Sequence, residues 1–115
     1  MQSLDELRQR LRAFAAERDW EQFHSPKNLA MALIVEAGEL VEHFQWLTQA
    51  QSLALTPDKR EQVAQELADV LIYLVRLADR LDVDLLAAAG RKLALNAEKY
   101  PAERARGRAR KYDEI

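Results

Sequence analysis

Two pairs of acidic residues constrain the fold of this chain more than any other feature of its sequence. Glu36 and Glu39 form one pair, Glu66 and Asp69 form the other, and each pair lies within an otherwise apolar run. On a helix, residues three apart share one face, so the two carboxylates of a pair lie about one turn from each other. No lysine or arginine follows either pair one turn later. The pattern therefore predicts helices that carry uncompensated negative charge into their packed faces.

A divalent cation between the two pairs explains this charge. Buried like charges repel one another and lose hydration, so four facing acids are stable mainly when something positive lies between them. Mg²⁺ takes oxygen ligands and is commonly shared with substrate phosphates. We therefore predict an all-oxygen Mg²⁺ site, in which Mn²⁺ can substitute. The alternative is that the acids form ordinary solvated or salt-bridged helix faces, which is the more frequent outcome for a single isolated pair.

The two histidines do not favour a redox-iron site. Di-iron helical bundles use a Glu-x-x-His pattern, with the imidazole three residues after a carboxylate. His43 follows Leu40 at that offset, and His24 lies in a predicted connector. We interpret His43 as a polar surface or interface residue. Because the chain has no cysteine, disulfides, zinc-thiolate sites and cysteine nucleophiles are excluded.

Start and stop signals divide the chain into four long helices. Ser3 begins a capping-box pattern, and Ser25-Pro26 and Thr56-Pro57 each combine an N-cap with a proline in the first turn. The first helix follows Ser3 and is interrupted by residues 18–26. The other three are predicted over about 26–48, 57–81 and 85–100, the last stopped by Pro101, with a polar connector over 49–56.

Composition supports an all-α fold in a single domain. Hydrophobic residues make up 49% of the 115, and there are only three glycines and three prolines. The formal charge of −2 gives no global basic field to recruit a nucleic-acid polymer or an anionic membrane. No apolar run approaches the roughly 20 residues of a membrane span, and the first residues lack a signal-peptide pattern. We therefore expect a cytoplasmic protein without a membrane partner.

Two of the predicted helices are apolar over most of their circumference. In the second helix, Met31, Ile34, Val35 and Val41 widen the apolar stripe almost all round. A helix of this kind is usually buried on more than one side. One small subunit cannot cover so much apolar surface, so we expect a four-helix subunit assembled through a helical core into a homo-oligomer.

The acidic pairs and several longer runs resemble a known family. Glu36-x-x-Glu39 followed by Glu66-x-x-Asp69 looks like the signature of the MazG-like all-α nucleoside triphosphate pyrophosphohydrolases. The likeness extends from about Leu7 to Tyr112. The runs that are similar to the dCTP pyrophosphatase branch of this family cover residues 14–24, 39–46, 69–75, 92–101 and 110–112.

The resemblance implies a Mg²⁺-dependent hydrolase. Members of the family cleave a nucleoside triphosphate between the α and β phosphates and release the monophosphate and pyrophosphate. At the matching positions, the implied catalytic metal ligands are Glu36, Glu39, Glu66 and Asp69. Ions held there bridge phosphate oxygens, offset charge on the leaving pyrophosphate and lower the pKa of a water. The implied role is house-cleaning of dCTP or modified pyrimidine deoxynucleotides by a homotetramer, built as a dimer of dimers.

The resemblance also implies a set of substrate-binding residues. Trp20 and Trp46 match aromatics that enclose the base, Tyr73 lines the pocket, and Lys92 and Asn96 fall where relatives contact the nucleotide. From the residues alone, the tryptophans would be interpreted as core packing, and Lys92 and Asn96 as exposed helix residues. One position departs from the pattern. Close eukaryotic relatives carry a histidine near the base where this chain has Leu11, which exchanges a polar wall for an aliphatic one.

Two rival functions follow from the same residues. The first is a broad-specificity or purine-tolerant nucleoside triphosphate pyrophosphohydrolase, and the second is a non-catalytic helical oligomer that binds a nucleotide. With the resemblance, residues 1–103 are expected to form a MazG-like pyrophosphohydrolase domain. Residues 104–115 form a basic C-terminal tail, whose Lys111 either reaches the triphosphate or is solvated.

Overall fold

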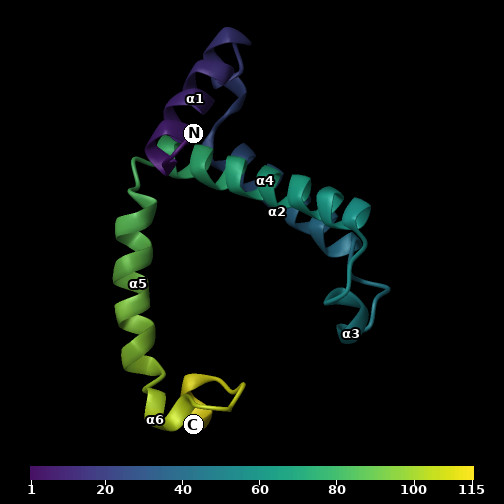
Figure 1. Cartoon of the computed structure of the whole chain (residues 1–115). Helices are drawn as coiled ribbons and strands as arrows, with labels where there is room; N and C mark the ends of the chain where they lie inside the picture. Colours follow the sequence, from purple (N-terminus) through teal and green to yellow (C-terminus); the bar gives the residue numbers. More distant parts are fainter. The chain divides into compact units, whose positions relative to one another are not determined.

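The computed structural model describes residues 1–115 and is built from helices joined by short connectors (Figure 1). The four long helices are α1 (Leu4–Glu17), α2 (Pro26–Glu42), α4 (Pro57–Arg80) and α5 (Leu85–Lys99). The shorter elements are η1 (Glu21–Phe23), α3 (Gln49–Ser52), α6 (Ala102–Ala105) and η2 (Tyr112–Glu114). The predicted all-α fold and its four long helices are therefore confirmed.

Side-chain caps fix where the long helices begin. The side chains of Ser3, Ser25 and Thr56 each accept a hydrogen bond from the backbone N–H three residues later, as the sequence predicts. Asp84 does the same for α5. Each cap satisfies one of the backbone donors that a helix start leaves free, and its loss typically costs about 1 kcal/mol.

The second long helix ends earlier than predicted, at Glu42 and not near Thr48. The N–H groups of Phe44 and Gln45 both donate to the Val41 carbonyl, so the chain leaves α2 through a tight turn. Thr48 is extended and forms a capping box with Gln51, which starts α3. Because an N-cap residue is not helical, Thr48 begins a new helix and cannot continue the old one. The predicted connector 49–56 accordingly contains α3.

The chain forms two compact units, Met1–Asp82 and Val83–Ile115, which are described separately. In the first unit, α2 and α4 pack side by side along their length, and α1 packs against the carboxyl-terminal part of α4 (Figure 1). The residues buried most deeply at these contacts are Ala15, Leu29, Val63, Val75 and Ala78. This packing sets the two acidic pairs, one on α2 and one on α4, on adjacent helices.

Large apolar side chains remain exposed on the surface of the single chain. All four residues that widen the apolar stripe of α2 are exposed, with Ile34 at 69%. On α5, Leu86 is 68% exposed and Leu93 is 70% exposed. An oligomer that buries these side chains, and with it the predicted four-helix subunit assembled through a helical core, stays a prediction.

In the second unit, the end of the chain packs back on α5. The rings of Tyr100 and Tyr112 meet edge to face at 6.1 Å, and Lys99 Nζ lies 5.1 Å from the centre of the Tyr112 ring. The predicted boundary between residues 103 and 104 falls inside this unit and stays a prediction. None of the helices in the structure has the length and apolar character needed to cross a membrane.

Candidate functional site

Three of the four predicted acids converge between α2 and α4. One carboxylate oxygen each from Glu36, Glu39 and Glu66 lies within 4.8 Å of the other two. Asp69 follows Glu66 by one turn on α4 and is not part of this trio. We refer to these four residues together as the acidic cluster. Their convergence results from α2 and α4 packing along their length, which is the arrangement that the sequence predicts.

The electrostatics of the acidic cluster are unfavourable for the protein alone. Burial raises the pKa of Glu36 from its ordinary 4.5 to about 7, and a hydrogen bond with Glu39 and the charges of Glu39, Asp69 and Glu66 act in the same direction. Oε2 of Glu36 and Oε2 of Glu66 are both buried without a hydrogen-bond partner in the protein. Unpaired buried polar atoms are costly, and here they are carboxylate oxygens that face like charge. This donor set fits a hard divalent cation.

His43 lies closer to the acidic cluster than the sequence interpretation suggests. Its Nε2 is 3.8 Å from Glu66 Oε1, although the two residues lie on different helices. His43 is the C-cap of α2 and follows Glu39 by one turn, which places it on the same face. The separation of one helical turn between Glu39 and His43 was the sequence signal that could have placed His43 beside the acidic cluster.

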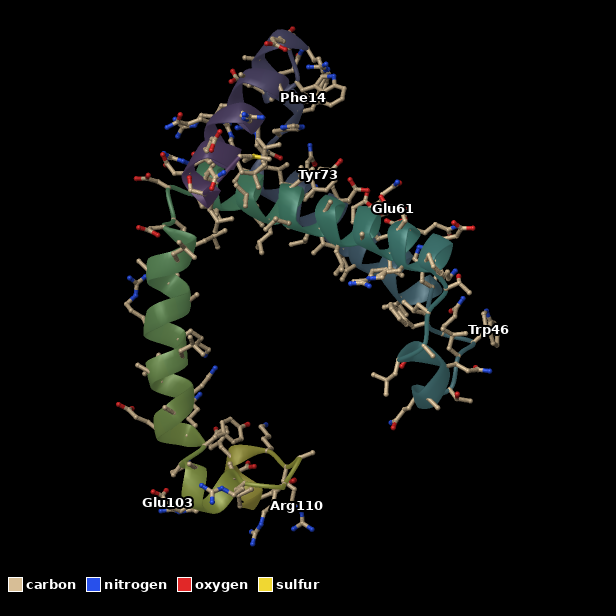
Figure 2. The ribbon with its side chains drawn as sticks, viewed as in Figure 1. Phe14, Trp46, Glu61, Tyr73, Glu103 and Arg110 are labelled. Atoms are coloured by element: carbon tan, nitrogen blue, oxygen red, sulfur yellow. The ribbon has the colours of Figure 1, made fainter.

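A pocket of about 290 Å³ adjoins the acidic cluster in the first unit. Asp69 lines it, and so do three residues that the sequence places near a base, Leu11, Trp20 and Tyr73. Phe14 adds a further aromatic ring from α1 and lies near Tyr73 of α4 (Figure 2). The structure therefore joins two predicted groups, the acids and part of the base-binding set, through Asp69.

The turn after α1 brings Trp20 to the pocket. Asp19 has a left-handed backbone with φ of 54°, and the N–H of Trp20 donates to the carbonyl of Ala15. The N–H of Asp19 donates to Ala16, which completes a Schellman motif. The turn reverses the chain and lays the Trp20 ring edge to face against Phe14, with the ring centres 5.8 Å apart. The position of Trp20 is thus set by backbone hydrogen bonds.

The other predicted substrate-binding residues do not line this pocket. Trp46 lies in the turn after α2, is 86% exposed, and is well separated from Tyr73 within the first unit (Figure 2). Lys92 and Asn96 lie on α5 in the second unit, where Lys92 is exposed and Asn96 is half-buried. Their predicted contacts with a nucleotide stay predictions.

Two polar residues that the sequence interpretation did not select, Arg76 and His24, also line the pocket, and Asp79 contacts Arg76 without lining it. Arg76 is only 5% exposed, and its Nε donates to Nδ1 of His24 at 3.2 Å. Asp79 lies one turn further along α4 and accepts two hydrogen bonds from Arg12 of α1, at 2.7 and 2.6 Å. The available signal was the position of Arg76 inside the otherwise apolar run Val70–Leu77, since a charge in such a run has a partner or a ligand.

Comparisons with known proteins place this chain among similar sequences. The model of the MazG-like family matches residues 31–115, a range that includes the whole acidic cluster. The human protein dCTP pyrophosphatase 1 is 49% identical over 115 residues, which cover 98% of this chain and 68% of the human protein. The rat protein of the same name is 48% identical with the same coverage.

A solved structure supports the same assignment. The crystal structure of a pyrophosphatase from Archaeoglobus fulgidus is 39% identical and superimposes with a TM-score of 0.80. The match covers 84% of this chain and 91% of the archaeal chain. With a family model that spans most of the chain and relatives of this identity and coverage, the chain belongs to the MazG-like family.

Proposed function

We propose that this chain is a nucleoside triphosphate pyrophosphohydrolase that cleaves dCTP, or modified pyrimidine deoxynucleoside triphosphates, to the monophosphate and pyrophosphate. The observation that carries the proposal is the joining of an acidic cluster to an aromatic pocket through Asp69. A nucleotide has the matching two parts, a polyphosphate that needs a cation and a flat base. The names of the human and rat relatives support dCTP as the substrate.

The acidic cluster is the proposed place of Mg²⁺. Glu36, Glu39 and Glu66 would hold it through the oxygens that converge between α2 and α4, with Asp69 as a fourth ligand. When bound, Mg²⁺ supplies positive charge that offsets the phosphate oxygens and the leaving pyrophosphate, and it makes water a better nucleophile. The two unpartnered carboxylate oxygens, on Glu36 and Glu66, are the observation that favours a cation here over a solvated acidic face.

The pocket is the proposed place of the base. Phe14, Trp20 and Tyr73 offer ring surfaces, and stacking of a base on an aromatic side chain is worth roughly 1–3 kcal/mol. Asp69 stands at the boundary between pocket and cluster, which orients the triphosphate toward the acids. Leu11 adds an aliphatic wall, which favours tolerance of substituents on the ring over a strict hydrogen-bonded fit.

A nucleotide panel tests this function. Release of pyrophosphate is measured with dCTP, 5-modified dCTP, dTTP, ATP and GTP, each with Mg²⁺ and each with a chelator. We expect hydrolysis only with Mg²⁺, and a higher kcat/KM for the cytosine nucleotides. Turnover of dCTP that is no better than that of ATP or GTP supports the broad-specificity alternative, which Leu11 favours. If no nucleotide yields pyrophosphate, the result supports the non-catalytic alternative.

The proposed active form is a homotetramer in the cytoplasm, where the nucleotide pool lies. The exposed apolar residues of α2 and α5 support assembly, because single chains rarely leave so many large apolar side chains in water. Light scattering with size separation measures the mass in solution. We expect four times the 13.2 kDa of one chain, and a monomer would overturn the assembly.

A further inference from the structure

The buried guanidinium of Arg76 in the aromatic pocket has no role in the function proposed so far. Arg76 lines the pocket, is 5% exposed, and its Nη2 is buried without a hydrogen-bond partner in the protein. An arginine that leaves one nitrogen unpaired in a buried position loses the hydration of that group without compensation. Such a group at the wall of a binding pocket indicates a ligand that accepts a hydrogen bond.

The other nitrogens of Arg76 are already occupied. Nε donates to His24 Nδ1 at 3.2 Å, and Nη1 makes a long contact of 3.5 Å with Asp79. These two contacts fix the plane of the guanidinium, because all of its N–H groups are coplanar. Nη2 is therefore the nitrogen that remains for a ligand.

Asp79 does not neutralise Arg76 by itself. Arg12 donates two short hydrogen bonds to Asp79, and Arg8 Nη1 lies 3.8 Å from the same carboxylate. One carboxylate is thus shared among three arginines, with the shortest bonds on the α1 side. Arg76 has only the long contact of 3.5 Å to Asp79, so its own charge is incompletely paired.

His24 holds Arg76 in this orientation as a neutral imidazole. Burial lowers the pKa of His24 first, and the charges of Arg76 and Arg80 lower it further. Its Nδ1 accepts from Arg76, so in the neutral ring the proton is on Nε2. His24 therefore acts as a positioning residue for Arg76.

We propose that Arg76 is a specificity-determining residue, whose Nη2 donates a hydrogen bond to the ring carbonyl of a pyrimidine base held between Trp20 and Tyr73. This inference rests on the proposed function in that it places the base in the pocket. Arginine has donors only, so its partner on the base is an acceptor. The 2-oxo group is the acceptor that pyrimidine bases share, and adenine has no carbonyl. A base without an acceptor there leaves the buried donor unpaired, which a site of this kind rejects strongly.

Three triphosphates separate a direct contact from a general structural effect. The first is dCTP, the second is its 2-pyrimidinone analogue, which keeps the ring carbonyl and lacks the amino group, and the third is a deoxyribose triphosphate without a base. Arg76→Met keeps an unbranched apolar stem of similar bulk and removes the donors. We expect kcat/KM to fall about 10- to 100-fold for both nucleotides, the range for loss of a charged hydrogen bond. The base-free substrate should change less than about threefold.

Two further variants control the result. Arg76→Lys keeps the charge with fewer donors and should fall between the wild type and Arg76→Met. Arg80→Met removes an exposed arginine one turn later on α4, and the ratio between dCTP and the base-free substrate should not change. Circular dichroism confirms that each variant is folded. Asp79 retains Arg12 when Arg76 is replaced, so the link between α1 and α4 is kept.

Each outcome decides the inference. An equal loss on all three substrates, no loss on dCTP, or a loss on dCTP that is absent with the 2-pyrimidinone analogue would overturn it. If the wild-type protein hydrolyses no nucleotide, the proposed function fails separately from this inference. The binding of deoxycytidine, measured by tryptophan fluorescence, then replaces hydrolysis as the test. Tenfold weaker binding by Arg76→Met would then support the contact, and equal binding would overturn it.

Discussion

Helix α4 carries two ionic groups that differ in how completely the protein satisfies them. Around Glu66, three carboxylates face one another with buried oxygens that have no partner. Around Asp79, opposite charges from α1 and α4 meet in short hydrogen bonds. We call the second group, Arg8, Arg12, Arg76 and Asp79, the Asp79 network. The first group needs something from outside the protein, and most of the second does not.

The two groups on α4 therefore have different roles: the acidic cluster has the features of a binding site, and the Asp79 network stabilises the fold. The acidic cluster is destabilising for the protein alone, a cost that is typical of a binding site. The Asp79 network links α1 to α4 and so holds one wall of the pocket in place. Arg76 belongs to both kinds, because its Nη1 contacts Asp79 within the network and its Nε donates to His24, while its Nη2 is buried without a partner in the protein.

Loss of one acid from the cluster should have the largest effect. Glu39→Gln and Glu66→Gln each remove a negative charge from the proposed metal site while keeping the shape of the side chain, so we expect pyrophosphate release to fall more than about 100-fold. Melting temperature should stay the same or rise, because like-charge repulsion is relieved. Glu61→Gln, an exposed acid on α4 (Figure 2), is the matched control. Full activity in both cluster variants would refute the metal assignment.

Removing the charge of Asp79 should have the next largest effect, this time on stability. Asp79→Asn weakens two short hydrogen bonds from Arg12, and we expect the free energy of unfolding in urea to fall by about 2 kcal/mol. Asp5→Asn breaks an exposed pair with Arg8 and should cost less than about 0.5 kcal/mol. If Asp79→Asn and Asp5→Asn lower the free energy of unfolding equally, the Asp79 network stabilises the protein no more than an exposed ion pair does.

The same network predicts a dependence on acid pH. The hydrogen bond from Arg12 lowers the pKa of Asp79 below its ordinary 3.8, and the charges of Arg12, Arg8 and Arg76 lower it further against the effect of burial. Its stabilisation is therefore present above the ordinary pKa and lost as pH falls through the lowered one. Urea unfolding of wild type and Asp79→Asn should converge at low pH. A gap that is constant with pH would contradict this.

A smaller effect is expected near neutral pH. The folded pKa of Glu36 is raised to about 7, so the stability of the metal-free protein is full below the ordinary value of 4.5 and declines as pH rises through 7. Melting temperature in a chelator should fall by a few degrees between pH 5 and 8, and added Mg²⁺ should restore it at pH 8. Glu36→Gln should remove the slope. A flat profile in the wild type would show that the acids are well solvated.

Trp46 provides the smallest predicted change. Because it is 86% exposed, Trp46→Ala should alter the unfolding free energy of the chain by less than about 0.5 kcal/mol. If its predicted contact with the base forms in an assembled enzyme, KM for dCTP should rise while kcat is kept. Phe14→Ala, which removes a pocket ring, is the comparison and should change both stability and KM. An unchanged KM in Trp46→Ala would limit the base site to the pocket of the first unit.

Helix starts and the convergence of the acids were predictable because they depend on local rules. Ser25-Pro26 and Thr56-Pro57 specify their helix starts within a few residues, and the apolar setting of the acids requires two facing helices. The end of α2 was not predicted, since the apolar rhythm continues through Phe44 and Leu47 while the backbone follows the capping box of Thr48. The short α3 was missed for the same reason.

The pocket was only partly predictable because its polar members depend on tertiary contacts. Arg76 was visible as a charge in an apolar run, but nothing in the sequence pairs it with His24, 52 positions away. Asp79, which contacts Arg76 but does not line the pocket, has the same limitation, since its partner Arg12 lies 67 positions away on α1. Contacts over such separations follow from the packing of α1 on α4 and not from periodicity.

The early end of α2 has a further electrostatic consequence. The aligned peptide dipoles of a helix place about half a negative charge at its carboxyl end, and the effect is felt within the last turn. Because α2 ends at Glu42 and not near Thr48, Glu39 lies in that last turn. The helix end and the carboxylates therefore attract a cation together. The turn at His43 therefore adds the negative end of α2 to the electrostatic potential at the acidic cluster.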